Sequence, residues 1–254
     1  MVEAYGLSDA GLVRASNEDC FLANEELRLF IVADGMGGHS AGEVASRLAV
    51  EAVDGFMRRT HGDTEFSWPY GIDPALSLDG NRLRTAIHLA NRRVFRAAES
   101  RDDYTGMGTT VVGALVSDGR LVIASVGDSR LYLLQAGAFV QLTQDDSWVA
   151  TILARDPQVD RAALAHHPMR HVLTSVLGAR EEVQVHVSER ALADGNLVLL
   201  CSDGLYGPVD EDSIRALLLE GGELPAIARR LVQAALDRGG PDNVTAVLIR
   251  YRKA

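Results

Sequence analysis

Residues 29–43, LFIVADGMGGHSAGE, contain the pattern that decides the fold. The apolar run 29–33 predicts a buried strand of ordinary length, which ends at Asp34. Four glycines follow within eight residues, and apolar residues then recur at helical spacing over 41–59. The stretch therefore predicts an acidic side chain at the end of a rigid strand, beside backbone that can approach a ligand closely. An acidic turn residue in an ordinary glycine-rich strand-to-helix loop is the alternative.

Composition narrows the class of protein. The chain has 254 residues, of which 47% are apolar and 24% are charged, as expected for one soluble globular enzyme domain. No run approaches the roughly 18 apolar residues that a membrane span needs, and the N-terminus has no signal region, so we expect no membrane association. The two cysteines, Cys20 and Cys201, form no disulfide framework, which favours the cytoplasm. A net charge of −10 without a basic cluster argues against nucleic acid as a partner.

Beyond the first helix the pattern changes to strands. Residues 109–117 and 120–126 predict two strands joined by a tight Asp118-Gly119 hairpin, and the meander continues through 130–142. Shorter strands are predicted at 2–7 and 21–23. Further strands are predicted at 183–187, 197–201 and 244–251, and further helices at 82–100, 211–219 and 225–236. Meandering strands with separate helices indicate an α+β layered fold rather than a βαβ-wound sheet.

Two long polar segments interrupt these elements. Residues 60–80 predict a mobile surface insertion, with a partner-docking role as the alternative. Residues 143–178 predict a flap packed on the body, which we expect to influence substrate choice and product release. The histidines of this flap lie on either side of Pro168, which disfavours a zinc site; they are His166, His167 and His171.

Acidic residues recur where turns meet apolar strands. Asp34, Asp203 and Asp242 each lie at such a junction beside a glycine or asparagine, and Asp128 has similar surroundings. Carboxylates contributed by distant parts of a chain are suited to hard divalent cations such as Mg²⁺ and Mn²⁺. The glycine-rich loop lacks the features of a P-loop or a dinucleotide fingerprint, and Ser202 lies in no Gly-x-Ser-x-Gly elbow. The sequence therefore favours a carboxylate-lined metal site.

Six ordered motifs resemble those of the metal-dependent protein serine/threonine phosphatases of type 2C (the PPM family) in their compact bacterial form. Each motif is weak alone, but together they span nearly the whole chain. They are Arg14-x-x-Asn17-Glu18-Asp19, Asp34-Gly35-Met36-Gly37-Gly38-His39, Gly108-Thr109-Thr110, Gly127-Asp128-Ser129-Arg130, Ser202-Asp203-Gly204-Leu205 and Asp242-Asn243.

The resemblance implies one catalytic domain over residues 1–254, built as a sandwich of two antiparallel β-sheets flanked by helix pairs. We expect this domain to be a monomer. The resemblance also implies two Mn²⁺ or Mg²⁺ ions in a cleft at one edge of the sandwich. The roles carried over from the family are as follows: Asp34 bridges both ions, the Gly35 carbonyl binds one, Asp203 and Asp242 hold the other, and Glu18 and Asp19 hold metal-bound waters. Asp128 and Asp203 would recruit a third, weaker ion, and Arg14 would receive the substrate phosphate.

Two positions depart from the family pattern. Met36 stands where many eukaryotic relatives have a histidine assigned as the general acid, and methionine cannot donate a proton. The alternatives are His39 and a water on the third ion, with a structural loop role also open for His39. Gly207 stands where relatives often have an acid, which predicts a weaker third site.

The expected function is hydrolysis of phosphoserine and phosphothreonine in phosphorylated proteins, opposing a bacterial Ser/Thr kinase. Two cations would lower the pKa of a bridging water, and the resulting hydroxide would attack phosphorus in line. A non-catalytic, phosphatase-like sensor or adaptor is the first alternative. A metal-dependent nuclease or phosphodiesterase is the second, and the acidic charge without basic–aromatic stretches disfavours it.

Overall fold

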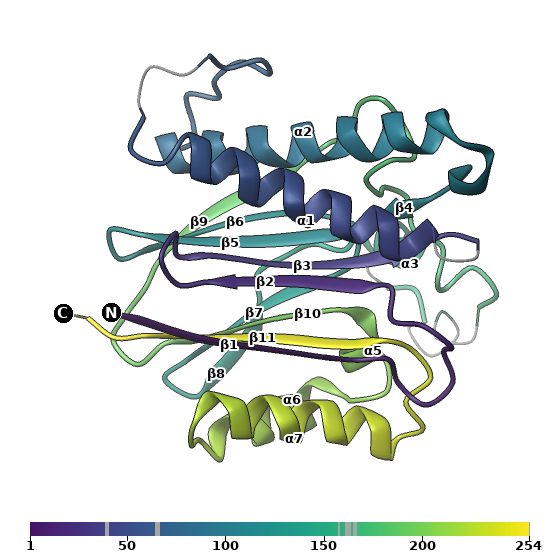
Figure 1. Cartoon of the computed structure of the whole chain (residues 1–254). Helices are drawn as coiled ribbons and strands as arrows, with labels where there is room; N and C mark the ends of the chain where they lie inside the picture. The colour runs from purple at the N-terminus through teal and green to yellow at the C-terminus, as the bar shows by residue number, and fades with distance from the viewer. Residues whose placement is uncertain (39–40, 64–66, 157, 161–163, 165–166, 254) are drawn as a thin grey trace.

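Two antiparallel β-sheets pack face to face, and a pair of helices covers the outer face of each sheet (Figure 1). This computed structural model describes residues 1–38, 41–63, 67–156, 158–160, 164 and 167–253. The strand order is β2-β3-β5-β6-β9 in the first sheet, with β4 paired to β3, and β1-β11-β10-β7-β8 in the second. The four-layer α-β-β-α arrangement implied by the family resemblance is therefore confirmed.

The elements have the following bounds. The first sheet contains β2 (Asp19–Asn24), β3 (Leu29–Met36), β4 (Gly108–Thr109), β5 (Val111–Ser117), β6 (Arg120–Val126) and β9 (His186–Ala191). The second contains β1 (Val2–Asp9), β7 (Arg130–Gln135), β8 (Ala138–Gln141), β10 (Leu197–Cys201) and β11 (Val244–Tyr251). The helices are α1 (Ala41–Arg59), α2 (Leu78–Ser100), α3 (Trp148–Arg155), α5 (Asp203–Tyr206), α6 (Glu211–Leu219) and α7 (Leu224–Asp237), with a 3₁₀ turn η1 at Asp102–Tyr104.

Strand β3 lies between two cores. Residues 29–33 are all 0% exposed. Leu29, Ile31 and Ala33 face α1 and α2, whereas Phe30 and Val32 face the second sheet. Because both faces of this strand are covered, its sequence is a continuous apolar run rather than an alternation, as predicted.

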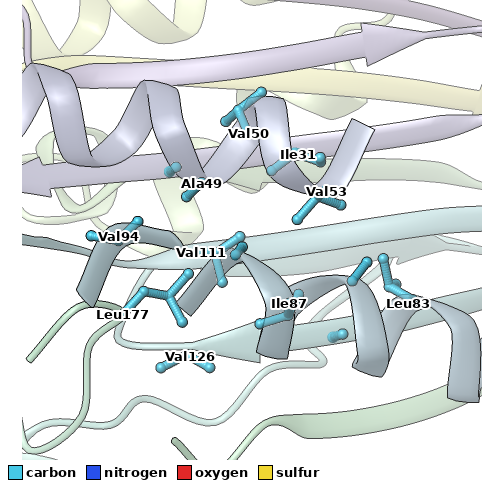
Figure 2. Close-up of a cluster of buried hydrophobic side chains, with 14 of the residues drawn as sticks. Ile31, Ala49, Val50, Val53, Leu83, Ile87, Val94, Val111, Val126 and Leu177 are labelled. Atoms are coloured by element: carbon cyan, nitrogen blue, oxygen red, sulfur yellow. The ribbon is translucent and has the colours of Figure 1, made fainter. Parts of the chain in front are cut away.

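Helices α1 and α2 close the outer core of the first sheet. The cluster joins apolar residues from these helices, from the sheet and from the end of the predicted flap; they include Ile31, Ala49, Val53, Leu83, Ile87, Val94, Val111, Val126 and Leu177 (Figure 2). Leu177 also exchanges two main-chain hydrogen bonds with Thr109. Residues 143–178, here called the flap segment, are therefore anchored in the core at their C-terminal end.

Several predicted bounds are wrong for identifiable reasons. β3 does not end at Asp34 but continues to Met36, because β4 pairs with Gly35 and Met36. The predicted strand 109–117 is divided at Thr110, whose N–H donates to the Asp34 carbonyl. β1 and β2 extend to Asp9 and from Asp19, beyond the predicted strands at 2–7 and 21–23.

Two other elements start elsewhere than predicted. The strand at 183–187 is wrong in extent, since β9 runs from His186 to Ala191 opposite β6. α2 begins at Leu78, before the predicted start, because the Ser77 hydroxyl caps it by accepting from the Gly80 N–H. α5 was not predicted, whereas the bounds of α1, α6 and β11 are confirmed. No helix of the described part of the chain combines the length and apolar character of a membrane span.

Candidate metal centre

One end of the sandwich carries a cleft of about 890 Å³ between the edges of the two sheets and the flap segment. β3 contributes Asp34 from the first sheet, and the β6–β7 turn contributes Asp128. α5 begins with Asp203 directly after β10, and Asp242 comes just before β11. Seven of the predicted site residues line this cleft: Arg14, Glu18, Asp34, Gly35, Asp128, Asp203 and Asp242.

Two predicted residues are not in that group, for different reasons. Asp19 is not among the residues that line the cleft, although it pairs with Asp34 across the β2–β3 ladder. His39 lies outside the described residues, as does His166 of the flap segment. The proton-donor role of His39 therefore stays a prediction.

Backbone contacts fix the position of Asp34. Its N–H donates to the Thr110 Oγ1 at 3.0 Å, and the Thr109 hydroxyl donates to its carbonyl at 2.8 Å. The next residue, Gly35, donates its N–H to the Glu18 carbonyl. A Cβ at Gly35 would lie 2.0 Å from the Gly42 carbonyl oxygen, so only glycine allows the strand to pass this close to the start of α1.

Asn243 joins the segments that carry Glu18 and Asp242. Its side-chain carbonyl accepts from the Glu18 N–H at 2.8 Å, and its side-chain amide donates to the carbonyls of Ala10 and Ser16. The loop before β2 is thereby held against the start of β11. The sequence motif contained Asn243, but its anchoring role could not be read from spacing.

A hydroxyl pair holds Asp19 behind the cleft. Ser202 and Thr245 both donate to its Oδ2, at 2.7 and 2.6 Å. Its Oδ1 is buried and has no hydrogen-bond partner among the described residues. Buried polar atoms are normally satisfied, so this oxygen is suited to a cation or to a cation-bound water.

Burial and mutual repulsion dominate the electrostatics of the acids. Burial, then the neighbouring charges of Asp19, Asp203, Asp128 and Asp242, raise the pKa of Asp34 well above its usual range. Burial, and then repulsion from Asp242, raises the pKa of Asp203. Burial raises the pKa of Asp19 to about 7 and that of Asp128 to about 7, and burial also raises the pKa of Glu18. Such a cluster is stable at neutral pH only with added positive charge, supplied by protons or by cations.

Arg14 supplies part of that charge. Its Nη2 donates to the Asp242 Oδ2 at 2.7 Å, and this hydrogen bond is the main cause of the raised pKa of Arg14. The Arg14 side chain is 51% exposed, so much of its guanidinium faces open solvent. It therefore retains donors for an incoming anion.

The described residues fit a hydrated metal site rather than a fully formed protein cage. No three of their acidic, histidine or cysteine side chains are grouped closely enough to hold an ion by themselves. Mg²⁺ commonly takes one or two carboxylates and keeps several waters, so no such group is required. Oxygen-only donors and the unpartnered Asp19 Oδ1 both suit a hard cation.

The cleft is also lined by flap residues for which no individual site role was predicted. Arg170, His171, Leu173 and Val176 of the flap segment line it. A positive charge on His171 would lower the pKa of Asp203. The only sequence signal for these residues was the polar stretch around Pro168, because their distance from the acids along the chain gives no indication of contact.

Comparison with known proteins agrees with this geometry. The profile of the family Protein phosphatase 2C matches residues 14–235. The serine/threonine protein phosphatase PstP of Mycobacterium tuberculosis is 39% identical over 244 residues, 95% of this chain, which spans only 43% of the length of PstP. The serine/threonine phosphatase stp of Listeria monocytogenes is 36% identical over 245 residues, covering 95% of this chain and 93% of the relative.

Solved structures extend the likeness to three dimensions. The crystal structure of M. tuberculosis PstP superimposes with a TM-score of 0.84 at 36% identity and covers 99% of both chains. The catalytic domain of PstP in complex with two manganese ions gives a TM-score of 0.82, again at 36% identity and 99% coverage of both chains. With the family profile matched over most of its length and close relatives along nearly all of it, this chain belongs to the protein phosphatase 2C family.

Proposed function

We propose that the chain hydrolyses phosphoserine and phosphothreonine in proteins, using Mn²⁺ or Mg²⁺. The observation that carries this proposal is the convergence of Asp34, Asp128, Asp203 and Asp242 with Arg14 on one cleft. These residues come from distant parts of the chain and from both sheets. The manganese complex of the PstP catalytic domain supports the choice of metal.

The cation-binding roles proposed for the individual residues are those that the family resemblance implies. Asp34 would be shared by two ions, with the Gly35 carbonyl on one and with Asp203 and Asp242 on the other. Glu18 and Asp19 would hold waters of the metal shell, and Asp128 with Asp203 would hold a third ion. When bound, two such ions activate a water for in-line attack and offset charge on the phosphoryl oxygens.

The remaining steps fall to side chains of the cleft. Arg14 would bind the phosphate through its planar set of donors, which suits phosphate oxygens better than a lysine does. Met36 lines the cleft but holds no proton to donate to the leaving serine or threonine oxygen. Opposition to a cognate kinase, a cytoplasmic location, a monomeric state and a specificity role of the flap segment stay predictions.

The direct test is phosphate release from a phosphothreonine peptide with Mn²⁺, with Mg²⁺ and with a chelator. We expect turnover with either metal and none in chelator. Bis(p-nitrophenyl) phosphate and single-stranded DNA are the matched substrates for the diesterase alternative, and we expect no comparable hydrolysis of either. Turnover that persists in chelator would refute the proposal, whereas Mn²⁺ binding without any hydrolysis would favour the sensor alternative.

Replacing Arg14 tests the phosphate-binding role. We expect Arg14→Ala to lower kcat/KM for the peptide by about 10- to 100-fold, mainly through KM, because charge-assisted hydrogen bonds contribute about 1.5–3 kcal/mol. Steady-state kinetics at saturating Mn²⁺ gives the measurement, since Arg14 also pairs with Asp242. Arg47→Ala is the matched control, because Arg47 is an exposed arginine that pairs with Glu43 on α1. Equal losses in both variants would remove Arg14 from this role.

A further inference from the structure

A tyrosine lies directly behind the predicted third-ion ligand. Tyr206, the last residue of α5, donates its hydroxyl to the main-chain carbonyl of Asp128 at 2.9 Å. The nearby hydroxyl also favours the charged form of the Asp128 carboxyl group and so acts to lower its pKa. Tyr206 therefore holds the backbone of Asp128 directly.

Arg130 holds the ring of Tyr206 in place. Its guanidinium carbon lies 3.7 Å from the ring centroid, a short cation–π contact. Arg130 in turn donates to the Asp145 carboxylate from Nε at 3.1 Å and from Nη2 at 2.7 Å. The Arg130 and Asp145 side chains are only 19% and 14% exposed, so solvent screens this pair little. These contacts consequently fix the position of the Tyr206 ring and its hydroxyl.

The other side of the β6–β7 turn is fixed as well. The Gly127 N–H donates to the Asp146 Oδ2 at 3.0 Å, and the Asp146 N–H donates to the Gly127 carbonyl at 2.9 Å. Gly127 has a φ of 97°, which favours glycine, and a Cβ there would lie 2.7 Å from Thr110 side-chain atoms. The backbone around Asp128 is therefore held from two sides, by Asp146 at Gly127 and by Tyr206 at the Asp128 carbonyl.

We propose that Tyr206 is a positioning residue that holds Asp128 through its main-chain carbonyl, so that the carboxylate stays directed toward a cation shared with Asp203. The inference rests on the proposed function, because it assigns a support to one of the predicted metal ligands. The Tyr206 hydroxyl donates to Asp128, so it is assigned to the support of the ligand and not to the cation itself. Its effect is to keep the carboxylate in one orientation before the ion arrives, which lowers the entropic cost of binding.

The test compares two single-hydroxyl deletions. Tyr206→Phe keeps the ring beneath Arg130 and removes only the contact with Asp128. Tyr132→Phe is the matched control, since the Tyr132 hydroxyl contacts Arg130 and Glu211. In calorimetric Mn²⁺ titrations we expect Tyr206→Phe to raise the Kd of the weakest binding event by about 3- to 10-fold, the usual effect of one hydrogen bond. The Mn²⁺ concentration for half-maximal phosphatase activity should shift equally, with kcat at saturating Mn²⁺ close to the original value.

A double variant separates positioning from a general structural effect. If Tyr206 acts through Asp128, then adding Tyr206→Phe to Asp128→Asn should leave the Mn²⁺ titration of Asp128→Asn unchanged. Additive effects, or a Tyr206→Phe titration identical to that of the unchanged chain or of Tyr132→Phe, would overturn the inference while leaving the proposed function intact. An unchanged chain that bound no Mn²⁺ at all would overturn both.

Discussion

An Asp34→Asn variant is expected to hydrolyse a phosphothreonine peptide at least about 10³-fold more slowly than the unchanged chain in saturating Mn²⁺. Asp34 is the proposed shared ligand, and removing its charge would weaken both cation positions at once. A loss of about 4 kcal/mol of transition-state stabilisation corresponds to that factor, which is within what metal-ion catalysis supplies. Phosphate release under single-turnover conditions gives the measurement.

The same variant should have the opposite effect on metal-free stability. Asparagine carries no charge, so the substitution relieves repulsion with Asp19, Asp203, Asp128 and Asp242. We therefore expect the Tm of Asp34→Asn in chelator at pH 8 to exceed that of the unchanged chain, by about 2–4 °C for each kcal/mol of repulsion removed. Higher stability with lost activity would identify a ligand rather than a structural residue.

Asp212→Asn, in the exposed first turn of α6, is the matched control and should alter neither activity nor the metal-free Tm appreciably. An Asp34→Asn variant that kept more than a tenth of the activity would contradict the proposed role of Asp34. A variant that lost both activity and stability would instead point to disruption of β3.

The part of the site that sequence could predict is the part encoded locally. The apolar run 29–33, the acid that follows it and the glycines before α1 are consecutive, and a buried strand entering a helix leaves that pattern whatever it packs against. The same holds for Asp203 after β10 and for Asp242 before β11. These junction acids were identified by their local surroundings, and the fold then brought them to one cleft.

Contacts between distant residues left no such signal. Arg14 and Asp242 are 228 positions apart, and neither carries a feature that indicates their ion pair. The hydroxyls that hold Asp19 come from Ser202, directly after β10, and from Thr245 in β11 of the other sheet. Tyr206 is an ordinary aromatic residue in the sequence, and only the fold brings its hydroxyl to the Asp128 carbonyl and Arg130 to its ring.

The predicted bounds of strands were wrong where pairing with a neighbouring strand, rather than local composition, sets the end of the strand. β9 extends through polar residues, including Glu189, because β6 provides pairing partners as far as Arg120. The Glu189 carboxylate also accepts a hydrogen bond from the Ser77 N–H at the start of α2. β3 continues past Asp34 only because β4 returns to pair with it. Neither extension is visible in the periodicity of the strand itself.

The metal-free protein is expected to lose thermal stability as pH rises from about 4 to 7. The pKa values of Asp19 and Asp128 lie at about 7, against an ordinary 3.8, so the folded state binds more protons than the unfolded chain across that window. Where the folded state holds the extra protons, the free energy of unfolding falls with rising pH. Burial lowers the pKa of His88 below its ordinary 6.5, so this group makes the free energy of unfolding rise with pH near that value. It is a single group, and the several acids with raised pKa values outweigh it.

Mn²⁺ should reverse this dependence, because the cations replace the protons that the acids lose. At a free concentration of about 100 times Kd, one bound ion adds about 2.7 kcal/mol. A protein of this size should then gain about 5–10 °C in Tm, most at pH 8 and least at pH 5, where protons compete for the carboxylates. Thermal unfolding at pH 5, 6, 7 and 8, with chelator and with Mn²⁺, gives both curves. A metal-free Tm that rises steadily across that range, or a Mn²⁺ effect independent of pH, would mean that the acids of the cleft do not repel one another when they are ionised. The cleft would then not be a cation site.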